Sequence, residues 1–268
     1  MDGAVNTPVN TGMHKLLEGR TALVTGAGGG IGRGLALALA GAGANVVIAA
    51  RRAETGDETR ALIEAEGGRA ICCPGDVTER AAVQRAVDAA LQRFGGLHIV
   101  VHNASSGRSG VPTPCEDIDD AGFDEQCGVA LDAAFHLAQA AFEPLRASGH
   151  GRFIILSSAQ ALHGGAMNPV YAAVKNAQRG LAKALAREWG PHGITVNAIA
   201  PAAATEATEA YFQRNPQVKD ALLASIALRR MGDMREDIGG AVVALCSDLM
   251  RFVTGQIIPV DGGAYTAL

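Results

Sequence analysis

The chain has 268 residues, of which 48% are apolar and 19% are charged, and its formal net charge is −4. This balance contains too much core-forming material for a disordered chain, and it lacks the basic excess typical of nucleic-acid-binding proteins. No segment approaches the roughly 18 consecutive apolar residues of a membrane span. Residues 1–18 are polar and mixed, without the apolar stretch of a secretory signal, and we expect them to form a flexible tail.

The cysteine and histidine patterns argue against disulfides and metal sites. The five cysteines are odd in number and include no C-x-x-C pair, and the seven histidines show no H-E-x-x-H spacing. Disulfide frameworks and zinc sites usually need such patterns. We therefore expect reduced thiols, no metal ligands and a cytoplasmic location.

Short apolar runs alternate along the chain with longer stretches of helical periodicity. The expected strands are Thr21–Thr25, Asn45–Ala50, Arg69–Cys73, Leu97–His102, Arg152–Ser157, Ile194–Ile199 and Gln256–Val260. The expected helices include Ile31–Ala42, Glu79–Phe94, Phe123–Leu145, Val170–Trp189 and Arg235–Cys246. Most of the strands are continuously apolar, which is typical of strands buried on both faces of a parallel sheet. The pattern predicts one α/β domain over residues 19–268, a Rossmann-type doubly wound parallel sheet of about seven strands with helices on both faces.

Residues 205–236 fit this alternation least well. They lie between the last two expected strands and contain Pro216 after the mixed stretch Tyr211–Asn215. Open α/β sheets bind ligands beyond the carboxyl ends of their strands, where an insertion at this point would lie. We predict that this segment covers a substrate.

A glycine-rich turn follows the first expected strand and opens the first helix. Gly26, Gly30 and Gly32 stand in the stretch Thr25–Gly32, although no register of it satisfies the strict G-x-G-x-x-G fingerprint. Glycines let a phosphate approach the backbone closely, and a helix N-terminus supplies free N–H groups. At the first strand-to-helix turn of an alternating chain, this pattern indicates a dinucleotide site, whereas tight packing is the alternative.

The end of the second expected strand bears on which dinucleotide binds. An acidic residue at this point would bond the ribose hydroxyls of NAD, but Ala50 is followed here by Arg51 and Arg52. An arginine can pair with a 2′-phosphate, which a carboxylate would repel. We therefore favour NADP(H) over NAD(H), with Arg51 as the phosphate contact, although Glu54 lies close by. The alternative is that both arginines only solvate the next helix.

Three polar side chains could perform acid–base chemistry. Tyr171 and Lys175 are four residues apart and therefore share one helix face. A nearby ammonium group favours the phenolate and lowers the pKa of a tyrosine. Ser158 follows a buried strand, a position from which a hydroxyl can polarise a carbonyl. A Tyr-x-x-x-Lys pair alone means little, but its combination with the serine and the glycine turn is rare.

These motifs together resemble the short-chain dehydrogenase/reductase family over nearly the whole chain, from Arg20 to Tyr265. The 3-oxoacyl-carrier-protein reductases look like the most similar branch. The matching segments are Thr25–Gly32, Asp76-Val77, Asn103-Ala104, Ser158, Tyr171 with Lys175, Val196-Asn197 with Pro201, and Gly255-Gln256 with Val260–Gly263.

The resemblance implies an enzyme that transfers a hydride between a nicotinamide cofactor and a carbonyl or alcohol. Tyr171 would be the general acid or base, Ser158 would hold the substrate oxygen, and Lys175 would lower the pKa of Tyr171 and bind the nicotinamide ribose. Asp76 and Val77 would contact the adenine, and Thr205 would reach the nicotinamide carboxamide. The cofactor site would then comprise Gly26, Gly30, Ile31, Gly32, Arg51, Asp76, Val77, Asn103, Ala104, Tyr171, Lys175, Pro201 and Thr205.

Three positions depart from the family pattern. Ala130 stands where many members carry an asparagine that anchors water in a proton relay, and an alanine cannot hold that water. Ser105 and Ala202 each replace a glycine beside the expected cofactor path. Bulk water or His102 could take over the relay, so we predict a working enzyme, slow or with unusual substrate demands. A dinucleotide-binding protein with little or no catalysis is the alternative from another functional class.

The loop after Ser158 offers Gln160, His163 and Met167 as substrate contacts, although a histidine in a loop can also be without a ligand. The loop carries no arginine that could clamp a carboxylate or phosphate. We therefore predict a neutral ketone or secondary alcohol as the substrate. A carrier-protein or acyl-CoA reductase ranks second, because His192 and Gly149 stand where docking arginines would be expected, although Arg146 and Arg152 are near.

Two expected helices, Phe123–Leu145 and Val170–Trp189, are apolar around much of their circumference. One core-facing stripe would not need so many apolar residues, which indicates a second buried face. The family resemblance implies that these helices form a dimer interface. It also implies that residues 261–268 contribute to a second one. We expect a homotetramer or homodimer, with no nucleic-acid or membrane partner.

Overall fold

The computed structural model describes residues 16–266, without side-chain detail at positions 110, 206, 207, 210 and 211. The predicted tail lies outside the described residues over positions 1–15. Leu17, which the sequence analysis places in that tail, is fully buried, and its N–H donates to the Ala42 carbonyl at 2.9 Å. The prediction is therefore wrong for Leu17, because this side chain belongs to the hydrophobic core.

Seven strands form one parallel sheet in the order β3-β2-β1-β4-β5-β6-β7. The chain winds outward from β1 through β2 to β3, and then crosses back to β4 and continues to β7. The predicted Rossmann-type fold is confirmed. The strands are β1 (Thr21–Thr25), β2 (Asn45–Ala50), β3 (Arg69–Pro74), β4 (Ile99–His102), β5 (Arg152–Leu156), β6 (Thr195–Pro201) and β7 (Ile257–Val260).

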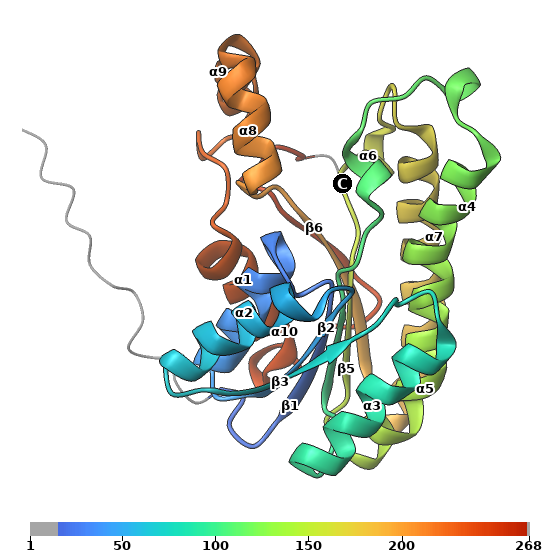
Figure 1. The fold of residues 1–268 in the computed structure, drawn as a ribbon, viewed down its shortest axis with the longest axis vertical. Helices are drawn as coiled ribbons and strands as arrows, with labels where there is room; N and C mark the ends of the chain where they lie inside the picture. The colour runs from blue at the N-terminus through green and yellow to red at the C-terminus, as the bar shows by residue number, and fades with distance from the viewer. Residues whose placement is uncertain (1–15, 267–268) are drawn as a thin grey trace, which may run out of the picture.

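The helices cover both faces of the sheet (Figure 1). One face carries α1, α2 and α10, and the other carries α3, α5 and α7. The longer helices are α1 (Gly30–Gly41), α2 (Ala53–Ala65), α3 (Arg80–Phe94), α5 (Ala133–Ala147), α7 (Pro169–Trp189) and α9 (Pro216–Ser225). The shorter ones are α4 (Asp120–Cys127), α6 (Gln160–His163), α8 (Glu206–Arg214) and α10 (Gly240–Cys246).

Successive strand residues point to opposite faces, which divides the core into two layers. Val46 and Ile48 of β2 pack under α1 on one face, whereas Val47 packs on the other, with α3 and α5. Continuous apolar runs are therefore what this fold requires of its strands. Among residues 16–266, no helix combines the length and the apolarity that crossing a bilayer would need.

The predicted helix Phe123–Leu145 is a composite. A π-helical turn, η3 (Gly128–Asp132), separates α4 from α5, although the backbone stays helical throughout. A second π-helical turn, η5 (Met234–Gly239), leads into α10. Helical periodicity predicted both stretches, although the first begins three residues earlier and ends two residues later than expected. It could not distinguish the i→i+5 pattern from the i→i+4 pattern.

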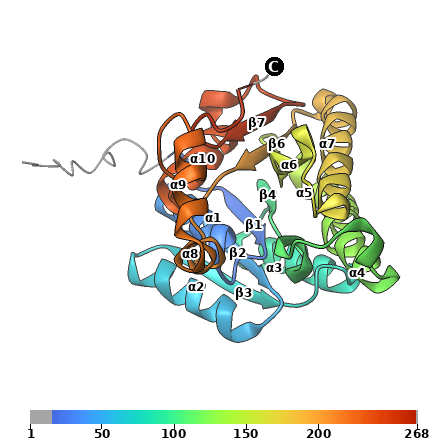
Figure 2. The same ribbon diagram turned by 90° about the horizontal axis from the view of Figure 1, so that it is seen from above.

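The segment 205–236 forms α8 and α9 followed by a loop. Thr205 begins α8 as its N-cap, where the side-chain oxygen accepts a hydrogen bond from the Thr208 N–H at 3.1 Å. Both helices stand beyond the carboxyl end of the sheet, on the side away from α4 and α6 (Figures 1 and 2). This placement is the one expected of an element that borders a ligand site.

Candidate active site

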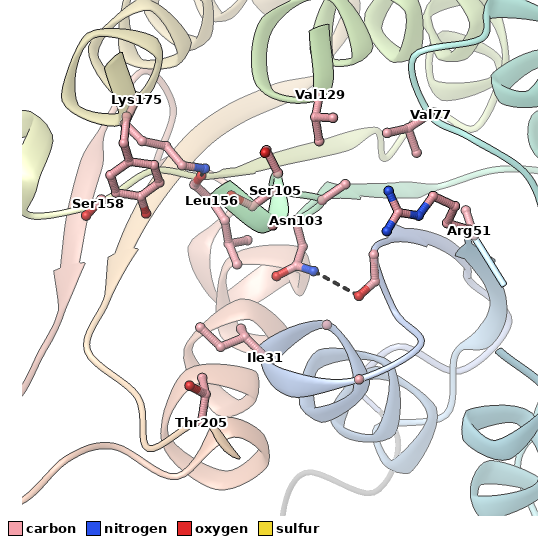
Figure 3. Close-up of a pocket in the computed structure, with 18 of the residues that line it drawn as sticks. Ile31, Arg51, Val77, Asn103, Ser105, Val129, Leu156, Ser158, Lys175 and Thr205 are labelled. Carbon is pink, nitrogen blue, oxygen red and sulfur yellow. Dashed lines mark hydrogen bonds between the residues drawn. The ribbon is translucent and has the colours of Figure 1, made fainter. Parts of the chain in front are cut away.

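A cleft of about 430 Å³ lies at the carboxyl ends of the central strands. Figure 3 shows Ser158 and Lys175 at one end of it and Arg51 at the other. The cleft is lined by Gly26, Gly29, Ile31, Gly32, Ala49, Arg51, Gly75, Asp76, Val77, Asn103, Ala104, Ser105, Ser106, Gly107, Glu125, Val129, Leu156, Ser157, Ser158, Tyr171, Lys175, Pro201 and Thr205.

The glycine turn forms the floor of this cleft. Gly26 has a φ of +66°, and a Cβ atom there would lie 2.9 Å from Ala104 Cα. A Cβ atom on Gly32 would lie 2.2 Å from the Gly26 carbonyl oxygen, so the turn packs tightly only without side chains at these positions. At Gly29, by contrast, nothing lies within 4 Å of the Cβ position. The space on this side is open to a ligand.

The N-terminus of α1 faces the same space. Its N-cap residue Gly29 provides no capping side chain, and the first turn contains no acidic residue. The first N–H groups therefore lack side-chain acceptors, and the helix dipole adds partial positive charge. These features fit the pyrophosphate of a dinucleotide. Gly30, a predicted contact, has a φ of +51° but does not line the cleft, so its contribution is to the shape of the turn.

Asn103 joins β4 to the glycine turn. Its Nδ2 donates to the carbonyl oxygens of Thr25 at 3.0 Å and Gly26 at 3.2 Å, the latter dashed in Figure 3. The Thr25 hydroxyl oxygen accepts the backbone N–H groups of Asn103 and Ala104 at 3.1 and 3.2 Å. This network sets the position of residues 103 and 104 beside the turn.

Arg51, Asp76 and Val77 lie together at the other end of the cleft. Asp76 Oδ1 accepts bonds from the N–H and the hydroxyl of Thr78 at 2.9 and 2.7 Å. These bonds lower the pKa of Asp76, and the charge of Arg51 lowers it further against the effect of partial burial. Arg51 is exposed, and no ion pair engages its guanidinium within the described part of the chain.

The structure brings Ser158, Tyr171 and Lys175 together. Lys175 Nζ lies 5.6 Å from the centre of the Tyr171 ring and donates to the Leu156 carbonyl at 2.6 Å. Ser158 interacts with the Tyr171 side chain, and its own oxygen accepts the Gln160 N–H at 3.2 Å. Pro169 occupies the first turn of α7, where its missing N–H costs no helical bond, and so fixes where this helix starts.

Burial has the largest effect on the pKa values of Tyr171 and Lys175. It raises the pKa of Tyr171, and the interaction with Ser158 opposes this only in part. Burial also lowers the pKa of Lys175 to about 8. The sequence predicts that Lys175 lowers the pKa of Tyr171, whereas burial in the folded protein moves that pKa upward. At neutral pH the site therefore presents a neutral phenol, the form that can donate a proton, beside a largely protonated ammonium.

A second pocket, also of about 430 Å³, adjoins Ser158 and Tyr171. Hydroxyl and amide groups dominate its lining. Gln160 and Met167 line this pocket as predicted, whereas His163 does not and instead has Nδ1 2.8 Å from the Gly164 carbonyl oxygen. The lining comprises Ser105, Ser106, Ser109, Pro112, Ser158, Gln160, Ala166, Met167, Asn168 and Tyr171.

The structure shows how two of the three positions that depart from the family pattern lie relative to the pockets. Ser105 lines both pockets, whereas Ala202 lines neither and bonds through its backbone to Val260 and Gly232. His102, considered above as a substitute relay, is fully buried, and its pKa is lowered to about 3. We reject that role, because His102 stays neutral at working pH.

Several residues that line the cleft were not predicted from the sequence. Glu125 of α4 lines it, and its carboxylate accepts the Ser106 hydroxyl at 2.6 Å and pairs with Arg108 at 3.2 Å. Val129 enters through the π-turn. No spacing rule marks these residues, because the loop 105–118 decides which face of α4 meets the cleft. Within residues 16–266, no three His, Cys, Asp or Glu side chains gather as metal ligands would.

Comparison with known proteins decides the family. A family model described as enoyl-(acyl carrier protein) reductase matches residues 26–265. A short-chain type dehydrogenase/reductase of known structure from Mycobacterium ulcerans is 31% identical with a TM-score of 0.86, over 92% of this chain and 90% of that one. The chain belongs to the short-chain dehydrogenase/reductase family.

Relatives in this family include the gluconate 5-dehydrogenase of Gluconobacter oxydans (strain 621H), which is 35% identical over 94% of this chain and 97% of its own. The 7alpha-hydroxysteroid dehydrogenase of Escherichia coli (strain K12) is 32% identical over 94% of this chain and 96% of its own. The resemblance inferred from the motifs is confirmed. The protein is a short-chain dehydrogenase/reductase, an oxidoreductase that transfers a hydride between a nicotinamide cofactor and a CH–OH or carbonyl group.

Proposed function

We propose that this enzyme interconverts a neutral ketone and its secondary alcohol, with NADP(H) preferred over NAD(H) and Tyr171 as the general acid or base. The observation that carries the proposal is the meeting of Ser158, Tyr171 and Lys175 where the dinucleotide cleft joins an uncharged polar pocket. Gly26, Ile31, Gly32, Asp76, Val77, Asn103, Ala104, Pro201 and Thr205 would hold the cofactor, with Gly30 shaping the turn.

A nicotinamide cofactor held in the cleft would supply the hydride for the carbonyl carbon of the substrate in the reductive direction. Ser158 donates a hydrogen bond to the substrate oxygen, and the Tyr171 phenol gives that oxygen its proton. The Lys175 ammonium then stabilises the phenolate until solvent returns a proton to it. Among the described residues, the Lys175 ammonium donates to Leu156 alone, so its other two N–H groups are free to bind the cofactor ribose.

The proton transfer step can be tested with Tyr171→Phe, which removes the hydroxyl and leaves the ring. We expect kcat to fall by about 10²–10⁴ while cofactor affinity changes less than about threefold. Tyr265→Phe is the matched control, because this tyrosine lies outside both pockets. A Tyr171→Phe enzyme that turns over as fast as the control would refute the proposal.

The absence of charge in the pocket supports a neutral substrate. No charged side chain among the described residues lines it, so it offers no direct partner to an anionic group of a substrate. We expect kcat/KM for a ketone to exceed that for a keto acid of the same skeleton by at least about tenfold, or ~1.4 kcal/mol. Equal values would contradict this substrate class.

The cofactor preference rests on Arg51. We expect NADPH to bind at least about tenfold more tightly than NADH, which corresponds to ~1.4 kcal/mol, and Arg51→Ala to remove the difference. The control is Arg52→Ala, since Arg52 is also exposed but does not line the cleft. A paired fluorescence titration measures both affinities. If NADH binds as tightly as NADPH to the wild type, the preference is wrong.

A carrier-protein or acyl-CoA reductase remains the second candidate, supported by the description of the matching family model. The two arginines considered for docking an acidic carrier are engaged elsewhere, because Arg152 is buried against Asp248 and Arg146 pairs with Glu143. An acyl thioester that is reduced faster on its carrier than as a small analogue would favour this candidate.

A third candidate is a dinucleotide-binding protein with little catalysis. Tight cofactor binding without turnover on a panel of carbonyl compounds would favour it.

We also propose a homotetramer or homodimer in the cytoplasm. Phe123 and Phe135 remain about half exposed on α4 and α5, the helices expected at an interface. All five cysteines are free thiols, which supports a reducing compartment.

A further inference from the structure

The π-turn η3 leaves one backbone carbonyl with an unusual set of partners. The carbonyl oxygen of Ala130 accepts a hydrogen bond from Gln178 Nε2 of α7 at 2.7 Å and lies 3.1 Å from His102 Nε2 at the end of β4. Both side chains are fully buried. A π-turn interrupts the helical i→i+4 pattern, so a carbonyl in it is available to groups from neighbouring elements. Three elements therefore meet at a single oxygen atom.

The bonds around His102 fix its tautomer. Its Nδ1 lies 3.2 Å from the Thr25 hydroxyl oxygen, which already accepts two N–H groups, from Asn103 and Ala104. A hydroxyl has two acceptor positions and one proton, so Thr25 must donate to Nδ1. The ring proton of the neutral imidazole then sits on Nε2 and points at the Ala130 carbonyl, with the backbone of Val129 in the same π-turn as a second contact. Because burial keeps His102 neutral, with a pKa of about 3, this arrangement does not change over the working pH range.

Burying the Gln178 amide at this position costs folding free energy. Its Oε1 has no hydrogen-bond partner among the described residues, and a buried unsatisfied oxygen destabilises a fold. An apolar side chain of the same length would avoid that cost. The benefit of the amide is therefore the one bond that it makes, to Ala130. Gln178 lies seven residues after Tyr171 on α7, which places both on the same face of this helix.

The three elements that meet at Ala130 each contribute to the active site. β4 leads into Asn103 and Ala104 of the cofactor cleft, and the π-turn projects Val129 into it (Figure 3). The helix α7 carries Tyr171, and its residues Val170 and Val174 pack against Ala130. A small shift of any element would change how the cofactor cleft and the phenol face each other.

We propose that His102 and Gln178 are positioning residues, which share the Ala130 carbonyl and thereby hold β4, the π-turn and α7 in the register that hydride and proton transfer need. The inference rests on the proposed role of Tyr171. Neither side chain touches the reacting atoms, and neither lines the cleft.

A double-mutant cycle tests the shared carbonyl. His102→Asn keeps a polar atom near Thr25 but is too short to reach Ala130, whereas Gln178→Met keeps the length and removes the donor. Each single variant leaves one donor in place, so we expect kcat to fall less than about threefold. The double variant leaves none, and we expect a loss of at least about thirtyfold, because misplacement by about 1 Å can cost 10²-fold. The cofactor Kd should change less than about threefold.

A second version of the cycle separates positioning from packing. His102→Gln places an amide nitrogen where Nε2 stood, so it keeps the bond to Ala130 and loses the one to Thr25. In the Gln178→Met background it should restore kcat to within about threefold of Gln178→Met alone. Val87→Ala, a core change in α3, controls for stability loss away from the site. The inference is overturned if the kcat loss in the His102→Asn, Gln178→Met double variant equals the product of the two single losses. It is also overturned if His102→Gln does not restore kcat in the Gln178→Met background.

The wild-type protein gives an independent readout if the double variant does not fold. Nitrogen-15 spectra of histidine-labelled enzyme should show one imidazole, absent from His102→Gln, that is protonated on Nε2 and does not titrate between pH 5 and 8. Protonation on Nδ1, or titration in that range, would overturn the inference. If Tyr171→Phe remains active, the proposed function fails. If Tyr171→Phe is inactive but the kcat losses of the His102 and Gln178 variants simply multiply, only the positioning role fails.

Discussion

Lys175 should make the protein less stable than it would be with an apolar residue at the same position. The residue is 3% exposed, and burial lowers the pKa of its ammonium group from the ordinary 10.5 to about 8. At about 1.4 kcal/mol per pKa unit, keeping the ammonium buried costs about 3 kcal/mol of folding free energy at pH 7. Lys175→Met removes this cost but leaves the Leu156 carbonyl without its donor, which costs about 1–3 kcal/mol. We expect the variant to lack turnover and to be about 1 kcal/mol more stable at pH 7.

The pH dependence isolates the electrostatic part of this effect. Below pH 8 the lysine is charged in both the folded and the unfolded chain, and the full cost applies. Between pH 8 and 10.5 the unfolded chain binds more protons than the folded one, so stability rises with pH. Relative to Lys175→Met, the wild type should gain about 2 kcal/mol from pH 7 to pH 9.5. The Leu156 bond does not contribute to this difference, because a neutral lysine also donates.

Urea unfolding at pH 7, 8, 9 and 9.5 measures the effect. Other groups also titrate in this range, but they do so equally in both proteins and cancel in the comparison. Lys183→Met is the matched control, since Lys183 is an exposed lysine on the same helix, and its curve should run parallel to that of the wild type. Parallel curves for Lys175→Met and the wild type would show that Lys175 is not destabilised by burial.

Further predictions concern the glycine turn and the assembly. Gly32→Ala should lower the free energy of unfolding by about 1–3 kcal/mol, because its Cβ would lie 2.2 Å from the Gly26 carbonyl oxygen, whereas Gly29→Ala should change it by less than about 1 kcal/mol. Similar urea midpoints for the two variants would contradict this packing. Light scattering should give the wild type a mass that is a multiple of 27.4 kDa, and Phe135→Glu should reduce it. A wild-type monomer would refute the predicted oligomer.

The sequence predicted the sheet well because its strands are buried on both faces. Thr21–Thr25 and Asn45–Ala50 have the predicted bounds, and the ends of the other strands differ from prediction by at most two residues. The helix α2 was not singled out, since only Gly56, Thr59 and Ile63 of it are buried and its apolar stripe is correspondingly thin. A local pattern is informative where burial is continuous, and it loses information where an element lies on the surface.

Local sequence patterns also predicted which residues can perform the chemistry of the site. The Tyr171–Lys175 spacing fixes one helix face, and the glycines of Thr25–Gly32 fix a turn that larger side chains would block. The directions of the pKa shifts were not accessible in this way. The raised pKa of Tyr171 comes from burial by segments distant in the chain, and no spacing rule reports the burial of a single hydroxyl.

The sequence by itself therefore determined the order of strands and helices along the chain, the glycine-rich turn and the residues that can carry acid–base chemistry. Only the tertiary structure decided what surrounds them. It buried Leu17 in the core, lined the pocket beside Ser158 with hydroxyl and amide groups, and brought His102 and Gln178 to the Ala130 carbonyl. The physical reason is that periodicity records which face of an element is buried. Which groups meet there depends on the packing of elements that are far apart in the chain.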